Sequence, residues 1–273
     1  MKTAFKILPE TSLDKTYDLL IEIGRGGFSL TWYSLMPFKM EGLSIYQAQR
    51  NSDDFMYADD LNKLLASETL PPYRSCKICY NFKEGMPVPN TCYDAAAREA
   101  MLNDVYGFTT GAVYFTQPVA NTEFSYIYRV PKAIDDVLKN RFAEATILHT
   151  NACLIASKKE LELYCVIYNS YIKCILFKGN ELQIIQSYDY QTPSDVAYHL
   201  LNICNLHNIL PESITITLSG FVDMQSSLYE EIYRYFLNVQ MEQLPQEVDI
   251  TDEIKAYPTH FFSYLISLIQ CAS

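Results

Sequence analysis

The stretch that decides the fold is Leu19-Leu20-Ile21-Glu22-Ile23-Gly24-Arg25-Gly26-Gly27-Phe28-Ser29-Leu30-Thr31-Trp32-Tyr33-Ser34-Leu35. Two apolar runs, 19–23 and 28–35, flank a glycine-rich turn, and a third run, 43–47, follows after 37–42. Short apolar runs that are separated by turn residues predict strands joined as hairpins. The three runs therefore predict an antiparallel three-stranded meander.

The rest of the first half alternates between helical and strand patterns. Leu61, Leu64 and Leu65 have helical spacing, and further helices are predicted over 93–105 and after Pro131, which suits a first helical turn. Strands are predicted over 77–82, 113–115 and 124–128. This half therefore adds alternating helices and strands to the meander.

The second half opens in the same way. Strands are predicted over 162–168, 171–177 and 182–188, joined by short turns, and Thr192-Pro193-Ser194-Asp195 can cap and begin a helix with Val196, Leu200 and Ile203 on its buried side. A strand over 213–218, a helix over 225–236 and a strand over 239–244 complete a βββαβαβ order. The last helix, begun near Pro258, is apolar almost all round and must be buried.

The order of these elements resembles the plan of the actin, sugar-kinase and heat-shock-chaperone ATPase superfamily. With Leu20-Ile21-Glu22-Ile23-Gly24, Pro87-Val88-Pro89, Arg129-Val130-Pro131 and 214–220 in this order, the chain more closely resembles an uncharacterised Bacteroidetes family. That family is a domain of unknown function with an actin-like ATPase fold, distantly similar to cytoplasmic actin-like domains of pilus assembly and type II secretion proteins.

The resemblance implies an α/β, two-lobed actin-like (ribonuclease H-like) fold in which each half is a mixed sheet with helices. Residues 1–155 would form the N-terminal lobe and 156–273 the C-terminal lobe. The last helix, about 257–271, would pack back on the region between the lobes.

In active members of the superfamily, an Asp-x-Gly turn in the first hairpin cradles phosphate and metal-bound water. Glu22-Ile23-Gly24 resembles this turn in part: Glu22 keeps the charge, and the backbone N–H groups of Arg25, Gly26 and Gly27 could approach an anion. The alternative is a glycine-assisted hairpin turn with Glu22 as a surface or edge residue.

The other two nucleotide-binding elements of the superfamily are eroded. The second hairpin turn reads Tyr168-Asn169-Ser170-Tyr171, without glycine or carboxylate, and the strand-end motif that packs adenosine retains only Gly220, followed by Phe221, whose ring could occupy the place of adenine. Only nine glycines occur in the chain. The resemblance thus gives Glu22, Gly24, Arg25, Gly26, Gly27 and Gly220 as weak nucleotide-binding candidates.

No catalytic residue and no metal ligand is assigned. Cys76, Cys79 and Cys92 have zinc-like spacing but lack a fourth ligand nearby, and the four histidines are scattered. The eight cysteines lie mostly in apolar runs and are interpreted as free thiols. Hydrolase-elbow, phosphate-loop and metalloprotease motifs do not occur.

The composition limits the classes of partner that the chain is expected to bind. A formal net charge of −11 disfavours nucleic acid, and the best basic cluster, Arg129, Lys132, Lys139 and Arg141 with Asp135 and Asp136, is interpreted as a solvated helix face. No run approaches the length of a membrane span, so the cytoplasm is the expected location and membrane insertion is not expected. An exposed cluster of Tyr229, Tyr233 and Tyr235 would indicate a protein partner.

The leading hypothesis is a non-catalytic binding or assembly module with degenerate nucleotide-binding loops, a protein partner and no expected cofactor. The alternative is a divergent nucleotide-dependent enzyme, an ATPase or small-molecule kinase, that uses ATP and Mg²⁺ at the Glu22–Gly27 loop. A third hypothesis is a different small ligand in the crevice between the lobes.

Overall fold

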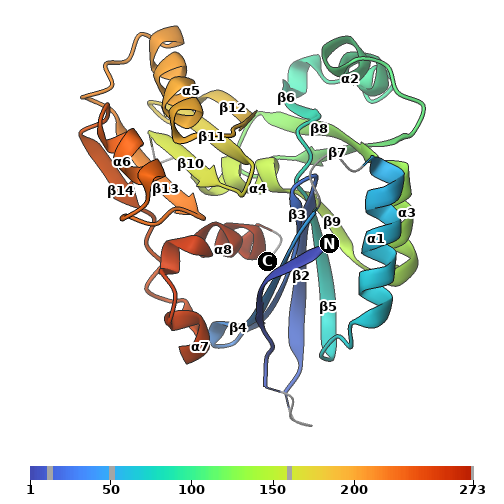
Figure 1. The fold of residues 1–273 in the computed structure, drawn as a ribbon. Helices are drawn as coiled ribbons and strands as arrows, with labels where there is room; N and C mark the ends of the chain where they lie inside the picture. The colour runs from blue at the N-terminus through green and yellow to red at the C-terminus, as the bar shows by residue number, and fades with distance from the viewer. Residues whose placement is uncertain (11–14, 49–52, 159–161, 272–273) are drawn as a thin grey trace. The chain divides into compact units, whose positions relative to one another are not determined.

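The computed structural model describes residues 1–10, 15–48, 53–158 and 162–271, and the chain divides into two compact units. Unit 1 comprises Met1–Ala156 with Gln246–Ile254, and unit 2 comprises Ser157–Pro245 with Lys255–Ser273. Their elements are labelled in Figure 1.

The main sheet of unit 1 contains the predicted meander. Strands β2 (Tyr17–Gly24), β3 (Gly27–Leu35) and β4 (Phe38–Gln47) pair antiparallel, which confirms the prediction. The sheet order is β1-β4-β3-β2-β5-β9, with β1 (Lys2–Ile7), β5 (Tyr73–Tyr80) and β9 (Thr146–His149), while β15 (Asp249–Ile250) pairs with β4. β2 is thus a central strand, with β3 on one side and β5 on the other.

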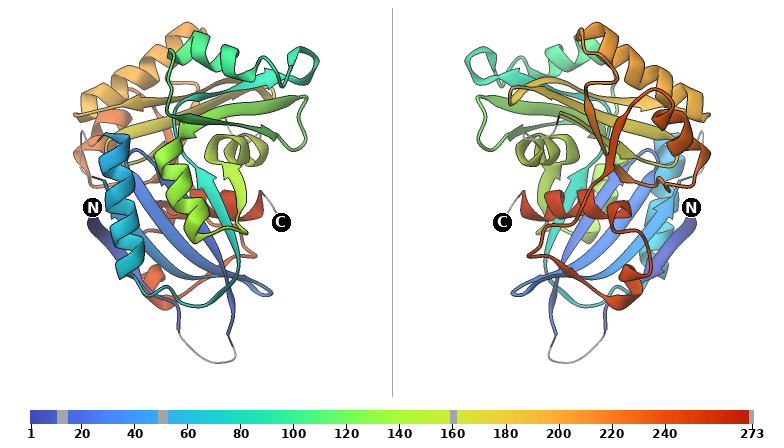
Figure 2. Two further views of the ribbon diagram at one scale, coloured as in Figure 1. Left: turned by 90° about the vertical axis from the view of Figure 1, so that its right-hand side faces the viewer. Right: turned by 90° about the vertical axis from the view of Figure 1, so that its left-hand side faces the viewer.

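Helices α1 (Asp54–Ser67) and α3 (Lys132–Arg141) pack together along this sheet, as Figure 2 shows in its left view. The helix predicted from the spacing of Leu61, Leu64 and Leu65 is confirmed as α1. It begins before these leucines because the side chain of Asp53 caps it by accepting a 2.7 Å hydrogen bond from Met56 N. A further helix, α4 (Thr150–Ser157), begins directly after β9. Neither β9 nor α4 was predicted.

A second sheet of unit 1 has the order β6-β8-β7, with β6 (Gly85–Pro89), β7 (Ala112–Pro118) and β8 (Phe124–Pro131). Helix α2 (Arg98–Tyr106) packs against it. The predicted helix start at 93 is wrong: 90–92 forms a 3₁₀ turn, η1, and α2 begins at Arg98.

The sheet of unit 2 has the order β12-β11-β10-β13-β14. Its predicted antiparallel meander is confirmed by β10 (Leu163–Ile167), β11 (Tyr171–Lys178) and β12 (Glu181–Asp189). Strands β13 (Thr215–Gly220) and β14 (Asn238–Met241) extend it in parallel, and α5 (Pro193–Leu206) packs against α6 (Ser227–Tyr233).

Two further details separate the predicted elements of this part of the chain from the observed ones. The predicted helix over 225–236 is shorter, because α6 ends at Tyr233. The last helix divides into a 3₁₀ turn η2 (Thr259–Phe261) and α8 (Ser263–Gln270), after the short α7 (Asp252–Lys255). Residues 263–269 of α8 are all buried, as the apolar pattern predicted.

Within the described part of the chain, no helix has both the length and the apolar character needed to cross a membrane.

Candidate functional site

Glu22, the first candidate residue, is buried in the centre of unit 1. Only 5% of its side chain surface is exposed, and Oε1 accepts hydrogen bonds from Asn81 Nδ2 (2.8 Å) and Thr150 Oγ1 (3.3 Å). Asn81 follows β5 and Thr150 begins α4, so two neighbouring elements hold the carboxylate. The interpretation of Glu22 as a surface or edge residue is therefore wrong, because β2 lies inside the sheet.

The glycines after Glu22 form the predicted tight hairpin turn, and the surrounding chain packs closely on it. A Cβ atom on Gly24 would collide with the carbonyl oxygen of Asn81, and one on Gly27, where φ is +139°, would collide with that of Tyr46. The Gly24 carbonyl accepts a 2.9 Å hydrogen bond from Tyr57 Oη. These two glycines are therefore required by the packing of unit 1, independently of any ligand.

The carbonyl groups of the turn also have partners inside unit 1. Gly26 O accepts a 3.1 Å hydrogen bond from the backbone N–H of Ala48, and Ile23 O accepts one of 2.7 Å from the N–H of Asn81. Arg25 pairs with two carboxylates, Asp54 at 2.6 Å and Glu84 at 3.6 Å. The positive charge of its guanidinium group is thus already paired with two neighbouring carboxylates.

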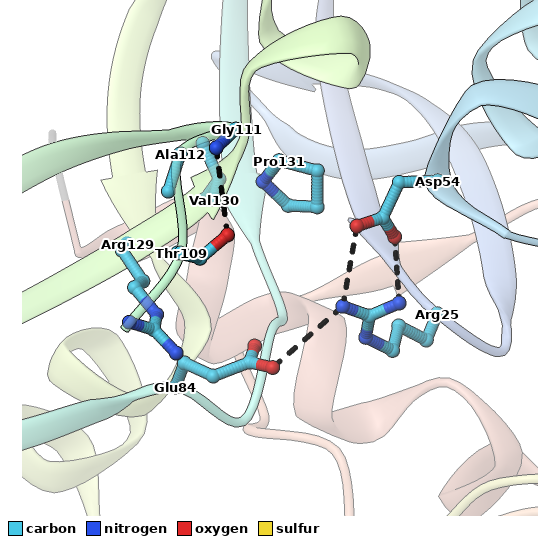
Figure 3. A pocket seen from close by; sticks show the side chains of 9 residues that line it. All are labelled: Arg25, Asp54, Glu84, Thr109, Gly111, Ala112, Arg129, Val130 and Pro131. Atoms are coloured by element: carbon cyan, nitrogen blue, oxygen red, sulfur yellow. Dashed lines mark hydrogen bonds and ion pairs between the residues drawn. The ribbon is translucent and has the colours of Figure 1, made fainter. Parts of the chain in front are cut away.

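Arg25 lines a small pocket of unit 1 with a volume of about 60 Å³ (Figure 3). Small-molecule sites typically enclose about 300–1,000 Å³, so this pocket has room for a few water molecules or a single small group. Four of the side chains that line it are charged, and the backbone and side chains of Ala112, Val130 and Pro131 form an apolar part of the wall. The lining residues are Arg25, Asp54, Glu84, Thr109, Gly111, Ala112, Arg129, Val130 and Pro131.

Arg129 is not part of a solvated helix face, contrary to the prediction for the basic cluster. It is buried in β8, and its guanidinium donates hydrogen bonds to Asn103 Oδ1 (2.8 Å), Gly107 O (2.6 Å) and Tyr106 O (3.1 Å). A cation at these carbonyl groups satisfies the C-terminal end of α2 and complements its dipole.

Asp135 is a second member of the basic cluster that is buried. It accepts a 2.7 Å hydrogen bond from Tyr80 Oη and pairs with Lys139 at 2.7 Å. Burial, together with the Asp135 carboxylate, raises the pKa of Tyr80 far above its ordinary value. Within this cluster, the pair of Lys132 and Asp136 does lie on an exposed helix face, as predicted.

The turn between β10 and β11 is closed by its own backbone. Tyr168 N donates to Tyr171 O (2.9 Å), Ser170 O accepts from Tyr190 N (3.0 Å), and neither Asn169 nor Ser170 has a positive φ. The rings of Tyr168 and Tyr171 stack at 4.4 Å beside it. The side chains of Asn169 and Ser170 and the rings of Tyr168 and Tyr171 thus surround this turn, whereas a glycine-rich turn would leave its backbone N–H groups unshielded.

Gly220 ends β13 with φ +83°, and a Cβ atom there would collide with the carbonyl oxygen of Ile167 on β10. That carbonyl accepts a 2.8 Å hydrogen bond from Phe221 N. The ring of Phe221 packs edge-on against Phe261 at 6.1 Å. Gly220 therefore serves the close approach of two strands.

A buried polar network in unit 2 was not predicted from the sequence. Glu242 accepts hydrogen bonds from Tyr164 Oη (2.7 Å) and Ser263 Oγ (2.5 Å), and it pairs with Lys158. Ser263 Oγ also lies 2.8 Å from Ser219 Oγ. Burial first, and the Glu242 carboxylate second, raise the pKa of Tyr164 well above its ordinary value. The network ties α8 to β10, to β13 and to the residue that follows β14.

The cysteines that suggested a zinc site do not come together. Cys76 and Cys79 are buried in β5, whereas Cys92 is exposed in η1. Among the residues that the structure describes, no group of three or more Cys, His, Asp or Glu could hold a metal ion.

The structure is similar to solved proteins with an actin-like fold. One is a Bacteroides thetaiotaomicron protein of unknown function with an actin-like ATPase fold: TM-score 0.73, 16% identity, covering 85% of this chain and 94% of that one. The PilM-PilN type IV pilus biogenesis complex matches with a TM-score of 0.61 and 13% identity over 92% of this chain and 97% of that one. The cytoplasmic domain of EpsL, an inner membrane component of the type II secretion system of Vibrio cholerae, matches with 0.48 and 8% over 94% and 96%.

The first two similarities establish the α/β actin-like fold that the order of elements predicted. No curated protein matches the chain. One family model matches residues 9–239, which is most of the chain. The chain therefore belongs to the family described as "Protein of unknown function (DUF3822)".

Proposed function

We propose that this protein is a non-catalytic binding or assembly module that works in the cytoplasm, and that its nucleotide-binding loops are degenerate. The observation that carries the proposal is the first hairpin turn, whose groups are engaged inside unit 1. Glu22 is hydrogen-bonded to Asn81 and Thr150, and Arg25 is paired with Asp54 and Glu84.

The charge around this turn supports the same conclusion. Glu22, Asp54 and Glu84 contribute three carboxylates near the turn against two cations, Arg25 and Arg129, and two of the carboxylates already bind Arg25. Opposite charge at close range attracts a phosphate, whereas excess carboxylate repels it. A triphosphate would have to displace Arg25 from its partners before the guanidinium could bind it.

The turn between β10 and β11 in unit 2 supports the proposal independently. The superfamily grips phosphate with backbone N–H groups of glycine-rich turns, which need main chain that no Cβ atom shields. Here Asn169 and Ser170 form the turn, Ser170 O is bonded to Tyr190, and stacked tyrosine rings lie beside it. The fold's presence in the PilM-PilN complex supports an assembly role for this chain.

The test combines binding and hydrolysis. The melting temperature of the purified protein is measured with ATP, ADP and a non-hydrolysable ATP analogue, each with Mg²⁺, and phosphate release is followed in parallel. A ligand at 100 times its dissociation constant would add about 2.7 kcal/mol of stability. We expect no shift with any of the three nucleotides and no phosphate release above that of buffer.

Two variants make the outcome specific. Glu22→Gln removes the charge at the first turn, and Glu10→Gln does the same at an exposed position as a control. Mg²⁺-dependent hydrolysis that Glu22→Gln abolishes and Glu10→Gln retains would overturn the proposal in favour of a divergent ATPase or kinase.

A further inference from the structure

Unit 2 exposes five large apolar side chains that belong to two short segments. Their exposed fractions range from 41% to 65%, although most residues of this size are largely buried in folded proteins. Three lie at alternate positions from the end of α6 to the residue before β14, and two lie at and after the end of α5. We call these five residues the α6 patch: Leu206, Leu210, Tyr233, Tyr235 and Leu237.

The two segments meet at the N-terminal ends of β13 and β14. Thr215 pairs with Asn238 in the sheet, and Asn238 Nδ2 donates a 3.1 Å hydrogen bond to the carbonyl of Glu212. Leu210 lies two residues before Glu212, and Leu237 directly precedes Asn238. The sheet therefore holds the two segments side by side, and Figure 1 shows β13, β14 and α6 together.

Buried residues anchor the aromatic end of the patch in unit 2. α6 ends with Arg234 N donating to Glu230 O (3.1 Å) and Phe236 N to Ile232 O (3.1 Å), and both Ile232 and Phe236 are buried. Tyr229 and Tyr233 stack at 5.9 Å. Rigid aromatic rings that lose little conformational freedom on binding are typical of interface anchors.

Acidic residues outnumber basic ones in the stretch of chain that carries the patch. Between residues 193 and 241 the sequence contains five acidic residues and one basic residue, Arg234, which is paired with Glu231 at 2.7 Å. Glu212 and Glu230 are both exposed. Glu212 lies two residues after Leu210, and Glu230 lies three residues before Tyr233. A surface of this kind attracts basic partners and repels acidic ones.

We propose that the α6 patch binds a basic, apolar segment of another protein, in which two or three large apolar side chains are flanked by Lys or Arg. The apolar side chains pack on the exposed leucine and tyrosine residues, and the cations pair with Glu212 and Glu230. This inference names the class of partner and rests on the proposed binding role.

Two other occupants fit the charge less well. A second copy of the chain would bring the same acidic surface, in a protein with a formal net charge of −11, against itself. A membrane with anionic lipids would repel the acidic rim, because membrane-surface binding relies on Lys and Arg. Charge therefore favours a basic protein segment.

To test this, peptides that bind the full chain without nucleotide are selected from a phage-displayed library of random 16-residue peptides. We expect enriched peptides that combine large apolar residues with Lys or Arg, and binding that weakens as salt rises. The patch variant Tyr233→Ser/Leu237→Ser should weaken binding at least tenfold, and so should the rim variant Glu212→Lys/Glu230→Lys. The matched control Phe55→Ser/Met56→Ser, on exposed residues of α1, should leave binding unchanged.

Each contrary result has a distinct form. Enrichment of acidic peptides, no enrichment at all, or binding that survives both variants overturns the inference. A concentration-dependent dimer that the patch variant abolishes assigns the patch to a second copy, and patch-dependent binding to phosphatidylserine vesicles assigns it to a membrane; either result also overturns it. Phosphate release from ATP, measured on the same samples, tests the proposed function separately. Circular dichroism verifies that each variant is folded.

Discussion

Asn81 Nδ2 lies 2.8 Å from Glu22 Oε1 and donates a hydrogen bond to it inside unit 1. The two residues are 59 positions apart in the chain, and they meet because β2 and β5 are parallel neighbours with Ile23 opposite Tyr80. The backbone N–H of Asn81 also bonds to Ile23 O at 2.7 Å. The first hairpin turn is thus fixed from behind by the residue that follows β5.

Replacing Asn81 by Leu tests this relationship. The leucine side chain has a similar size but no donor, so the buried Glu22 carboxylate loses one of its hydrogen bonds. Leaving a buried acceptor without its partner costs about 1–3 kcal/mol. We expect urea denaturation, followed by circular dichroism, to show a loss of stability in this range.

The control for Asn81→Leu is Asn62→Leu, because Asn62 is exposed on α1. A surface substitution of this kind changes stability by about 0.5 kcal/mol or less. Equal effects of the two substitutions would show that the hydrogen bond to Glu22 contributes nothing measurable.

A pair of glycine substitutions separates backbone conformation from close packing. Gly179 and Gly220 both have positive φ, but a Cβ atom on Gly179 has open space around it, whereas one on Gly220 collides with Ile167 O. A left-handed conformation costs a non-glycine residue about 1–2 kcal/mol. We expect Gly179→Ala to lose about that much in urea denaturation, and Gly220→Ala to lose clearly more because β10 and β13 must also separate. A loss at Gly220 no larger than at Gly179 would contradict the required close approach.

The strands of both meanders could be predicted because their apolar runs are continuous and end at turn residues. Strand β6 was missed because Pro87 and Pro89 disfavour an internal strand, and the observed strand pairs only with β8 among the described residues. Helix α4 was missed because six of its eight residues are buried, so it lacks the alternation of polar and apolar faces that identifies a helix.

The environment of the candidate site could not be predicted for a different reason. The sequence around Glu22 shows a carboxylate beside glycines, but the donors Asn81 and Thr150 are 59 and 128 positions away. Arg129 and Asp135 likewise resemble a surface pattern, and only the positions of α2 and β5 make them buried. Long-range packing of this kind leaves no local periodic signal.

The N-terminus of α5 provides a third prediction. Thr192 Oγ1 accepts a hydrogen bond from Asp195 N, and the Asp195 side chain accepts one from Thr192 N, so the predicted capping box is confirmed. Thr192→Ala removes the first bond, and substitutions of this type cost about 1 kcal/mol. Thr192→Ser retains the hydroxyl and should keep nearly all of the stability. Equal unfolding midpoints in urea for the alanine variant and the unmodified protein would rule out a contribution from the cap.

The buried tyrosines predict how stability changes in alkali. Burial, with the Glu68 carboxylate as a further cause, raises the pKa of Tyr46 from 10.0 to about 12, and burial raises that of Tyr188 to about 12. Since the folded state holds these protons more tightly than the unfolded chain, their contribution to stability is complete below about pH 10. It is lost as the pH rises from 10 to 12.

We therefore expect the free energy of unfolding to fall steeply between pH 10 and 12, and the phenolate absorbance of the buried tyrosines to appear together with loss of the circular dichroism signal. Tyr46→Phe should make the decline shallower over this interval, because phenylalanine cannot ionise. Tyr198→Phe, at an exposed position of α5, controls for the substitution itself. An unchanged slope in the Tyr46 variant would mean that the proton on this phenol is not held more tightly in the folded state.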